Sequence, residues 1–267
     1  METQSRTIVR NAESIAIGEI SLLSFDDFRE SVIQATECGA RISALFGQPL
    51  NERVIRLIAV LSRDTLGSLT VVSCEIGKSY QALTPDCPQA HLFECEIAEQ
   101  WAVRPEGHPW LKSVRKLRAA EAFYQIRDED VHEVAVGPVH AGIIEPGHFR
   151  FQCRGEIVSH LEIALGYQHR GIERAMVGGP HKRTLHLMEA LAGDTSAGHA
   201  LAYCQAVESL SGTAVPGRAD ALRGICVELE RMANHAGDLG ALAGDVGYLP
   251  TASFCGRLRG SFLNMSA

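Results

Sequence analysis

The sequence predicts an α+β fold in which a small α/β domain precedes a β-hairpin and a helical bundle. Three observations carry this prediction. Short β-branched runs and helical patterns alternate in the first part of the chain. An alternating apolar pattern follows the charged stretch at residues 127–130, and helical periodicity fills most of the remainder. We therefore place one domain at residues 1–126 and the other at residues 127–267.

A helix is predicted over Ser24–Cys38. Ser24 is a typical N-cap because its hydroxyl can accept a hydrogen bond from a backbone N–H of the first turn. Gly39 is typical of the residue that follows a helix, because glycine adopts the left-handed conformation without strain. Local signals therefore set both ends of this helix.

Two strands are predicted next, Val54–Leu61 and Ser68–Ile76. Both are β-branched runs, and the turn-like sequence SRDTLG between them predicts that they are neighbours in a sheet. The segment KSYQALTPDCPQ is typical of extended and turn structure. The pattern of HLFECEIAEQWAV predicts a helix that ends before RPEGHPWL, where proline and glycine interrupt it.

The second domain opens on a predicted hairpin. Its first strand, His148–Cys153, has alternating apolar residues, and a turn signal follows at Arg154-Gly155. The second strand, Ile157–Leu165, is expected to bring its apolar side chains to the matching face. The apolar side chains of the two strands are Phe149, Phe151, Cys153, Ile157, Leu161, Ile163 and Leu165.

The clearest helix of the chain has one apolar and one polar face. Its polar face includes Glu228 and Arg231, which are close enough in helical spacing to form an ion pair. The chain stops at RLRGSFLNMSA with a helix under way, so we expect its natural relatives to continue further. The apolar face consists of Leu222, Ile225, Cys226, Leu229, Met232, Ala233, Ala236 and Leu239.

Charge and hydropathy exclude several classes of function. The formal net charge is −7 and no basic run stands out, which gives no support to nucleic-acid binding. No run approaches the roughly 18 apolar residues of a membrane span, and the N-terminus lacks the basic-then-apolar order of a secretory signal. We therefore expect a cytosolic chain, which can still dock on a membrane complex.

The cysteines and histidines give no local metal motif. No two of the eight cysteines stand three apart, so the usual signatures of zinc ribbons, iron–sulfur clusters and thioredoxin-type chemistry are missing. Eight of the eleven histidines lie from His140 onward, and none of their pairs has the spacing of a helical HExxH site. We predict no metal site, and we expect most of the thiols to be small buried hydrophobic groups.

His140 and Glu145 are the two candidate site residues. The Gly–Pro pair of GPVHAG predicts a constrained loop, on which His140 could exchange a proton near neutral pH or only tie down the loop. Glu145 precedes a second turn signal, Pro-Gly. It could be a proton-relay carboxylate or an ion-pair partner of Arg150 or Arg170.

Two further polar motifs have structural interpretations. RGIE (Arg170–Glu173) is interpreted as a salt-bridged helix start. In AGDTSAGH there is neither a GxGxxG nor a P-loop, so no nucleotide cradle is predicted. Its polar residues are interpreted as the cap of the helix that follows: Asp194, Thr195 and Ser196.

Five ordered blocks resemble one known family. FECEIAEQWAVRPEGHPWL (Phe93–Leu111) resembles the signature of the 30-kDa subunit of complex I. GPVHAGIIEPGHFRF, GYQHRGIE, HALAYCQAVE and VELERMANHAGDLG resemble blocks of the 49-kDa subunit and of the related nickel–iron hydrogenase large subunit. Their order is similar to the fused large subunit of membrane-bound, energy-converting hydrogenases of the formate hydrogenlyase type. The resemblance implies a 30-kDa-subunit-like domain followed by the N-terminal part of a 49-kDa-subunit-like domain.

The resemblance also implies that the redox metal has lost its ligands. In the family, two CxxC pairs hold the nickel–iron centre. Aligned on the histidine that matches His199, the first pair falls on Ala192 and Thr195, and the family's arginine falls on Ala190. Alanine offers no donor atom and a threonine hydroxyl is a poor ligand for such a metal. The second pair would lie beyond Ala267, so an active hydrogenase is disfavoured.

Complex I likewise lacks these cysteines and binds quinone in the vacated cavity. There, a histidine in a GPxH loop and a tyrosine near the lost motif contact the quinone. The histidine matches His140, whereas no aromatic residue occupies Ala190–Gly198. Glu145 matches the glutamate that transfers protons in hydrogenases. The resemblance thus implies quinone binding by His140, proton transfer by Glu145, and a structural role for His199.

Three functions stay open. The first is a non-metallated, hydrogenase-like subunit of a complex-I-like oxidoreductase on the cytoplasmic face of the inner membrane. It would assemble with membrane subunits and with an iron–sulfur subunit that holds the clusters. The second is a quinone-reducing subunit with quinone as its substrate. The third is a degenerate or truncated structural homologue without catalytic activity. No cofactor is predicted in this chain itself, and catalysis by the isolated chain is not expected.

Overall fold

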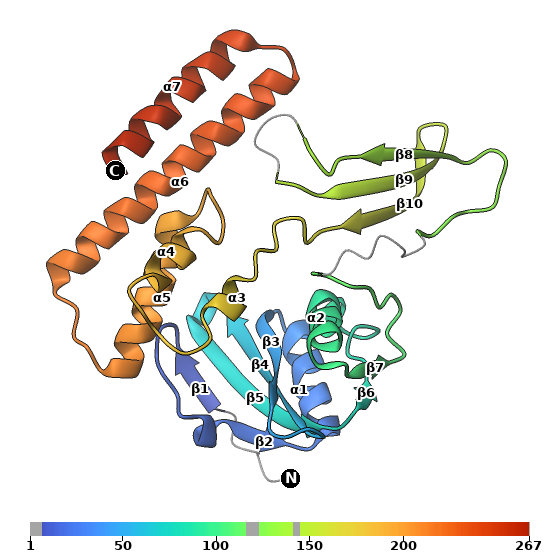
Figure 1. Cartoon of the computed structure of the whole chain (residues 1–267), viewed down its shortest axis with the longest axis vertical. Coiled ribbons are helices and arrows are strands. Elements are labelled where there is room, and N and C mark those ends of the chain that lie inside the picture. The colour runs from blue at the N-terminus through green and yellow to red at the C-terminus, as the bar shows by residue number, and fades with distance from the viewer. Residues whose placement is uncertain (1–6, 116–122, 141–144, 267) are drawn as a thin grey trace. The chain divides into compact units, whose positions relative to one another are not determined.

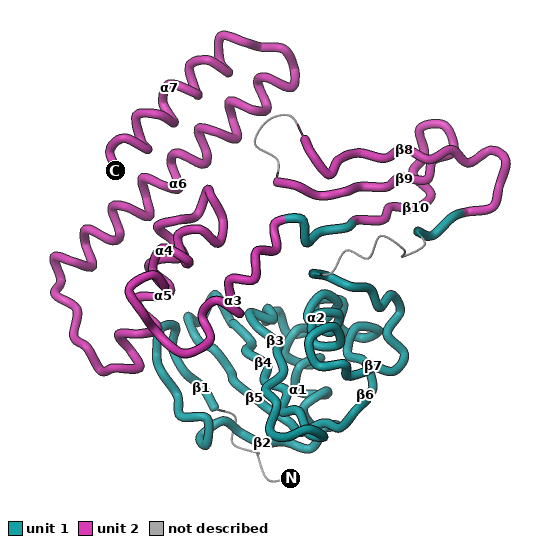
Figure 2. The backbone as a smooth tube through the Cα atoms, viewed as in Figure 1, with its two compact units in different colours: residues 1–125, 164–167 teal, residues 126–163, 168–267 magenta. Residues whose placement is uncertain are grey.

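The computed structural model describes residues 7–115, 123–140 and 145–266. Helices and strands are mixed along the chain, which confirms the predicted α+β class. The chain divides into two compact units, which Figure 2 shows in different colours. Unit 1 consists of residues 1–125 and 164–167, and unit 2 consists of residues 126–163 and 168–267. Each unit has its own set of helices and strands.

Unit 1 is built on a five-stranded sheet (Figure 1). The strands lie in the order β1-β5-β4-β3, and β2 also pairs with β5. β4 and β5 pair antiparallel from Ile55 opposite Ile76 to Arg63 opposite Ser68, which confirms the two predicted neighbouring strands. The five strands are β1 (Thr7–Arg10), β2 (Ser21–Leu23), β3 (Arg41–Pro49), β4 (Ile55–Arg63) and β5 (Ser68–Ile76).

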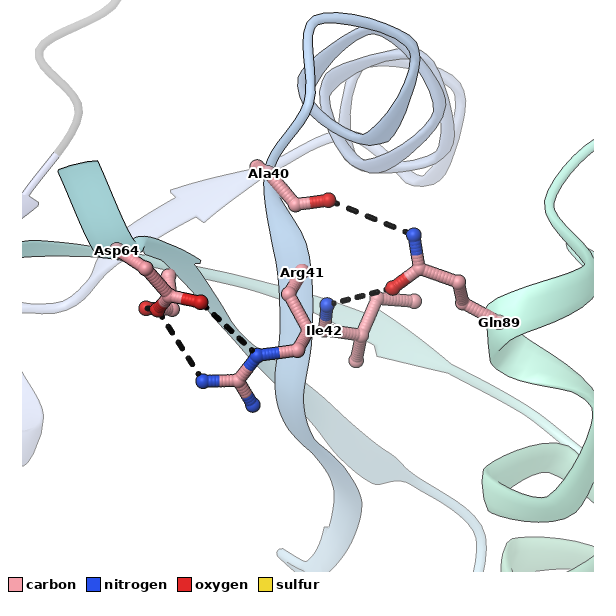
Figure 3. Close-up of polar contacts among 6 residues, drawn as sticks. Ala40, Arg41, Ile42, Asp64 and Gln89 are labelled. Carbon is pink, nitrogen blue, oxygen red and sulfur yellow. Dashed lines mark hydrogen bonds and ion pairs between the residues drawn. The ribbon is translucent and has the colours of Figure 1, made fainter.

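The sequence pattern does not predict β3, because a β-bulge interrupts its alternation. The register shifts between Ile42 and Ala44, and both Ile42 and Leu45 are buried. Gln89, in a short 3-10 turn, binds the backbone where this strand begins (Figure 3). Its Oε1 accepts from the Ile42 N–H at 3.0 Å, and its Nε2 donates to the Ala40 carbonyl at 3.4 Å.

Helices α1 (Phe25–Glu37) and α2 (His91–Trp101) pack against the sheet. The ends of α1 are those predicted: the Ser24 Oγ accepts from the Asp27 N–H at 3.1 Å, and Gly39 follows with φ +83°. Burial of each large aliphatic side chain in this core stabilises the fold by roughly 1.5–3 kcal/mol. Large, deeply buried members of the core include Phe28, Val32, Leu45, Leu57, Leu61, Val72, Leu83 and Ile97.

The carboxylate of Glu94 in α2 is fully buried in unit 1. It accepts hydrogen bonds from the Leu83 N–H at 2.8 Å, the Thr84 N–H at 2.9 Å and the Thr84 hydroxyl at 2.5 Å. These three donors replace the water that a buried carboxylate loses. They fasten α2 to the segment after β6 (Ser79–Gln81), which pairs in parallel with β7 (Arg104–Glu106).

Unit 2 contains a three-stranded sheet in the order β10-β9-β8. Its strands are β8 (His132–Val136), β9 (His148–Arg154) and β10 (Ile157–Ala164), so the predicted hairpin is confirmed. The apolar side chains of β10 are largely exposed, with Ile157 71% exposed and Ile163 44% exposed. β10 is an edge strand of a small sheet, and the buried positions of the hairpin are Gln152, Cys153 and Glu162.

The rest of unit 2 is helical. Its helices are α3 (Ile172–Ala175), α4 (Thr184–Glu189), α5 (Ser196–Ser211), α6 (Gly217–Asp245) and α7 (Leu249–Ser266). α6 and α7 pack along each other as a helical hairpin (Figure 1). No helix within the described ranges is long and apolar enough to cross a membrane.

Small residues bring α6 and α7 close together. A Cβ added at Gly240 would lie 3.1 Å from the Cβ of Cys255, so the two backbones approach closely at that point. The amphipathic helix predicted from the sequence is α6, and its Glu228–Arg231 ion pair is present, with Nε to Oε2 at 3.0 Å. Its apolar face is buried only in part, through Leu229, Ala233 and Ala236, whereas Leu222, Ile225 and Leu239 are more than half exposed.

Candidate functional site

The loop that carries His140 is tied to the start of β9. The His140 Nε2–H donates to the Gly147 carbonyl at 2.8 Å, and the imidazole packs edge-on against Phe149 with ring centroids 5.9 Å apart. Gly137 has φ +88°, and a Cβ there would lie 2.1 Å from the Gly147 oxygen, so only glycine fits. This geometry matches the loop-tying role, and it leaves Nδ1 as the nitrogen that can accept a proton.

Glu145 is exposed, directly before the turn that leads into β9. The two arginines considered as its partners bind other groups. Arg150 pairs with Glu133 of β8 at 2.7 Å, and Arg170 donates to the carbonyls of Ala190 and Leu191, the latter at 2.9 Å. Glu145 takes no part in these contacts of Arg150 and Arg170. Its role as a proton relay stays a prediction.

Arg170 binds the backbone just before Ala192, the residue predicted to match the first cysteine of the family's pair. Its guanidinium donates to two carbonyls at the C-terminal end of α4, immediately before Ala192. A helix does begin just after Arg170, at Ile172, as the RGIE motif predicts. The described partners of Arg170 are these carbonyls rather than an acidic side chain, because the last carbonyls of a helix attract a cation.

The cap of α5 differs from the predicted one. Thr195 is the N-cap residue, but its side chain makes no capping hydrogen bond. The carboxylate of Glu230, from α6, instead accepts from the Ala197 N–H at 2.6 Å and the Gly198 N–H at 3.1 Å. The prediction from Asp194, Thr195 and Ser196 is therefore wrong about the capping group, because a distant carboxylate reaches the first turn of the helix.

A polar pocket is lined by residues of α6 and α7 and by Asp194, which lies just before α5. The Arg259 guanidinium pairs with the Asp194 carboxylate at 2.9 Å, and the Asn234 amide donates to the Asp194 carbonyl at 2.7 Å. Asp194, Asn234, Gly237, Asp238 and Arg259 line the pocket, which we call the α5–α7 pocket. A Cβ at Gly237 would lie 3.2 Å from the Arg259 side chain, so glycine lets Arg259 pass over α6.

The other end of α5 is also fastened to α6. Arg223 donates to both carboxylate oxygens of Glu208, at 2.6 and 3.0 Å. This hydrogen bonding holds the pKa of the Glu208 carboxyl below its usual value. His199, in the first part of α5, donates from Nδ1 to the Thr195 carbonyl at 2.8 Å. Its contact is thus with the backbone of Thr195, one of the two positions predicted to match the family's first cysteine pair.

The structure separates the candidate residues into two groups. His140 and Glu145 belong to the loop before β9, whereas Ala192, Thr195 and His199 lie at the start of α5. Sequence reasoning missed Glu230 and Arg259, since neither has a local motif. It also missed a cluster of metal-ligating side chains in unit 1, His91, Cys95 and His108. The signal for this cluster was the spacing of His91 and Cys95, one helical turn apart.

No protein-family model matches the chain. It is 29% identical over 199 residues to hydrogenase-4 component G of Escherichia coli K12, covering 64% of this chain and 36% of that protein. It is 29% identical over 236 residues to formate hydrogenlyase subunit 5 of the same strain, covering 76% of this chain and 42% of that protein. It is also 36% identical over 118 residues to an NADH-quinone oxidoreductase subunit of Dehalococcoides mccartyi BAV1, covering 43% of this chain and 32% of that protein.

These relatives confirm the resemblance to hydrogenase large subunits and to complex I subunits. Each is named as a component or subunit of a larger assembly. The chain spans less than half the length of each of these three relatives.

Proposed function

We propose that this chain is a hydrogenase-like large subunit of a complex-I-like oxidoreductase and works without a nickel–iron centre. The single observation that carries the proposal is the donor set at the start of α5. Ala192 has no donor atom, and the Thr195 hydroxyl is a poor ligand for a soft metal centre. The residues present therefore do not fit the bimetallic group, and no catalytic step is routed through it.

The surroundings of these two positions support the same proposal. Glu230 binds the first turn of α5, Arg170 binds the end of α4, and Arg259 binds Asp194. Side chains of the protein thus bind the start of α5, the end of α4 and the Asp194 carboxylate, all of which lie next to Ala192 and Thr195 in the sequence. These contacts support a role in which this segment packs within the subunit and holds no metal.

Assembly with other subunits is part of the proposal. Several large apolar side chains of α6 and α7 are exposed, which is typical of surfaces that a partner covers. One relative is named a membrane-bound hydrogenase subunit, and others are named NADH-quinone oxidoreductase subunits. We infer an iron–sulfur partner and membrane subunits, with this chain at the cytoplasmic face of the membrane. The exposed side chains are Leu222, Ile225, Leu239, Leu242, Leu249 and Phe254.

The test is metal analysis of the natural complex. The complex would be purified from its own cells under conditions that preserve hydrogenases, and its nickel content measured by mass spectrometry. Nickel well below one atom per chain is expected, with no infrared bands from carbonyl and cyanide ligands. Stoichiometric nickel together with those bands would overturn the proposal.

A second candidate function, quinone reduction, is favoured by the geometry of His140. Reduction of a quinone to a quinol takes two electrons, which the iron–sulfur partner would supply, and two protons. Because His140 Nε2–H is bound to the Gly147 carbonyl, a hydrogen bond to a quinone oxygen must come from a protonated Nδ1. His140 would then hold the quinone and donate a proton, and Glu145 would relay protons nearby.

A further inference from the structure

Three side chains with nitrogen and sulfur donors converge in unit 1. His91 is the first residue of α2 and Cys95 lies one turn later, so both project from one face of that helix. His108 follows β7, which pairs with β6, and Gly107 with φ +79° turns the chain before it. Local helix geometry and one strand pairing therefore bring residues 13 to 17 positions apart into contact.

The distances among the donor atoms match a tetrahedral metal site. His91 Nδ1 and His108 Nε2 are 3.3 Å apart, and the Cys95 Sγ is 3.9 Å from each of them. Zinc bonds of about 2.0–2.1 Å to nitrogen and about 2.3 Å to sulfur place two nitrogens about 3.3 Å apart in a tetrahedron. The same bonds place sulfur and nitrogen about 3.6 Å apart.

The cluster is sheltered on one side and open on the other. Cys95 is 2% exposed, whereas both histidines are half-buried. Trp110 stacks on His91 with ring centroids 6.0 Å apart, and the Lys112 ammonium lies over Trp110.

Without a metal, the same groups form hydrogen bonds. The backbone N–H of Trp110 donates to His108 Nδ1 at 3.1 Å, and the Cys95 thiol donates to the backbone carbonyl of Trp110. Because Nδ1 of His108 accepts, its Nε2 carries the hydrogen and donates to His91 Nδ1. A metal at His108 Nε2 requires the proton on Nδ1, so the contact with the Trp110 N–H must open. The loss of one hydrogen bond is small beside the gain of three metal–ligand bonds.

We propose that His91, Cys95 and His108 bind one zinc-class divalent ion. Two imidazoles and one thiolate are ligands that zinc prefers, whereas magnesium and calcium prefer oxygen. Binding breaks the Cys95 S–H bond, forms a sulfur–metal bond and releases one proton to solvent. The fourth position is open to water, because the half-buried histidines leave that side accessible. The site does not depend on the function proposed above, because it lies in the other unit.

The experiment titrates the full chain with zinc and with cobalt. The protein would be stripped with a chelator, and zinc binding measured by competition with a chromophoric chelator. One equivalent is expected to bind, and cobalt is expected to give a thiolate charge-transfer band with the intense visible bands of tetrahedral coordination. Binding of less than one equivalent at matched protein and zinc concentrations would overturn the proposal.

Variants assign the ligands. Cys95→Ser, His91→Gln and His108→Gln should each weaken zinc binding by on the order of 100-fold or more, since even outer contacts to a metal ligand are worth 10–100-fold. The matched controls are Cys38→Ser and His132→Gln, both at exposed positions, and they should bind as the parent does. Equal affinity of the parent and Cys95→Ser would overturn the site.

A measurement on the unmodified chain covers the case in which a variant does not fold. X-ray absorption at the zinc edge should fit one sulfur and two imidazole nitrogens, with one lighter ligand in the fourth position. A coordination shell without sulfur would rule out Cys95 as a ligand and overturn the proposal. Release of one proton per bound zinc in weakly buffered solution is the expected companion result.

Discussion

The carboxylate of Glu230 in α6 accepts a hydrogen bond from the Ala197 N–H in the first turn of α5 at 2.6 Å, in place of a local cap. The same carboxylate also binds the Gly198 N–H. Two of the backbone donors that a helix start leaves without partners are thus satisfied by another helix. This contact orders the chain next to Ala192 and Thr195, onto which the resemblance places the family's first cysteine pair.

Replacing Glu230 with alanine should destabilise unit 2 by about 1 kcal/mol, the usual cost of losing a helix cap. Faster hydrogen exchange at the Ala197 and Gly198 amides should accompany the loss. The matched control is Glu228→Ala on the exposed face of α6, which should leave those amides unchanged. Equal exchange in both variants would mean that the cap does not order α5. Urea unfolding and amide exchange by NMR or mass spectrometry provide the measurements.

Replacing Glu94 with glutamine should destabilise unit 1 by on the order of 2 kcal/mol, because buried donors left without an acceptor cost roughly 1–3 kcal/mol each. The amide would place an N–H group against the donors of Leu83 and Thr84. Glu37→Gln, at the exposed end of α1, is the control with the same chemical change. Urea denaturation followed by circular dichroism would compare them. Similar midpoints for both variants would contradict the anchoring role of Glu94.

Replacing Gly137 with alanine should disrupt the His140 loop more than the same change at Gly155. Both glycines have positive φ, so both variants carry the strain of a left-handed residue, about 1–2 kcal/mol. Only at Gly137 would the new Cβ collide with the Gly147 carbonyl, whereas nothing lies within 4 Å at Gly155. The variant G137A should therefore be the less stable in thermal unfolding. Equal melting temperatures would show that the loop adjusts without cost.

Stability should fall in alkaline solution because of Cys74. Burial raises the pKa of its thiol to about 12, from 9.0 when unfolded. The unfolded chain loses this proton first, so the contribution is complete below pH 9 and falls by about 1.4 kcal/mol per pH unit between pH 9 and pH 12. Urea unfolding from pH 7.5 upward would measure the slope. Cys74→Ala should remove the part of the pH dependence of the unfolding free energy that comes from this one thiol. An unchanged slope in the variant would contradict the assignment of that pH dependence to Cys74.

In the assembled complex, His140→Gln should lower quinone reductase turnover by at least about 10-fold. This lower limit is conservative, because a positioned proton donor usually contributes about 100-fold or more. His132→Gln in the neighbouring strand β8 is the control and should keep normal turnover. Normal activity of assembled His140→Gln would remove the quinone-reducing function and leave the nickel prediction untouched.

Local signals predicted the elements whose ends and faces are set within a few residues. Helix α1 is an example, because Ser24 and Gly39 act on backbone groups of the adjacent turn. The pairing of β4 with β5 followed from the turn between them. Strand β3 escaped prediction because its bulge breaks the period of two, which no neighbouring residue indicates. The helix signal in α6 was correct, but it did not show which part of the apolar face is buried.

For the candidate site, too, the sequence determined one part and the tertiary structure another. The sequence by itself determined which atoms are available: a histidine on a Gly–Pro loop, and alanine and threonine at positions 192 and 195, where the resemblance implies two family thiolates. Only the tertiary structure decided their partners: Glu230 at the start of α5, Arg170 at the end of α4, and His108 beside His91 and Cys95. Helix caps and strand turns act over a few bonds along the chain, whereas these contacts join residues that are distant in sequence. Their geometry therefore exists only after the chain has packed.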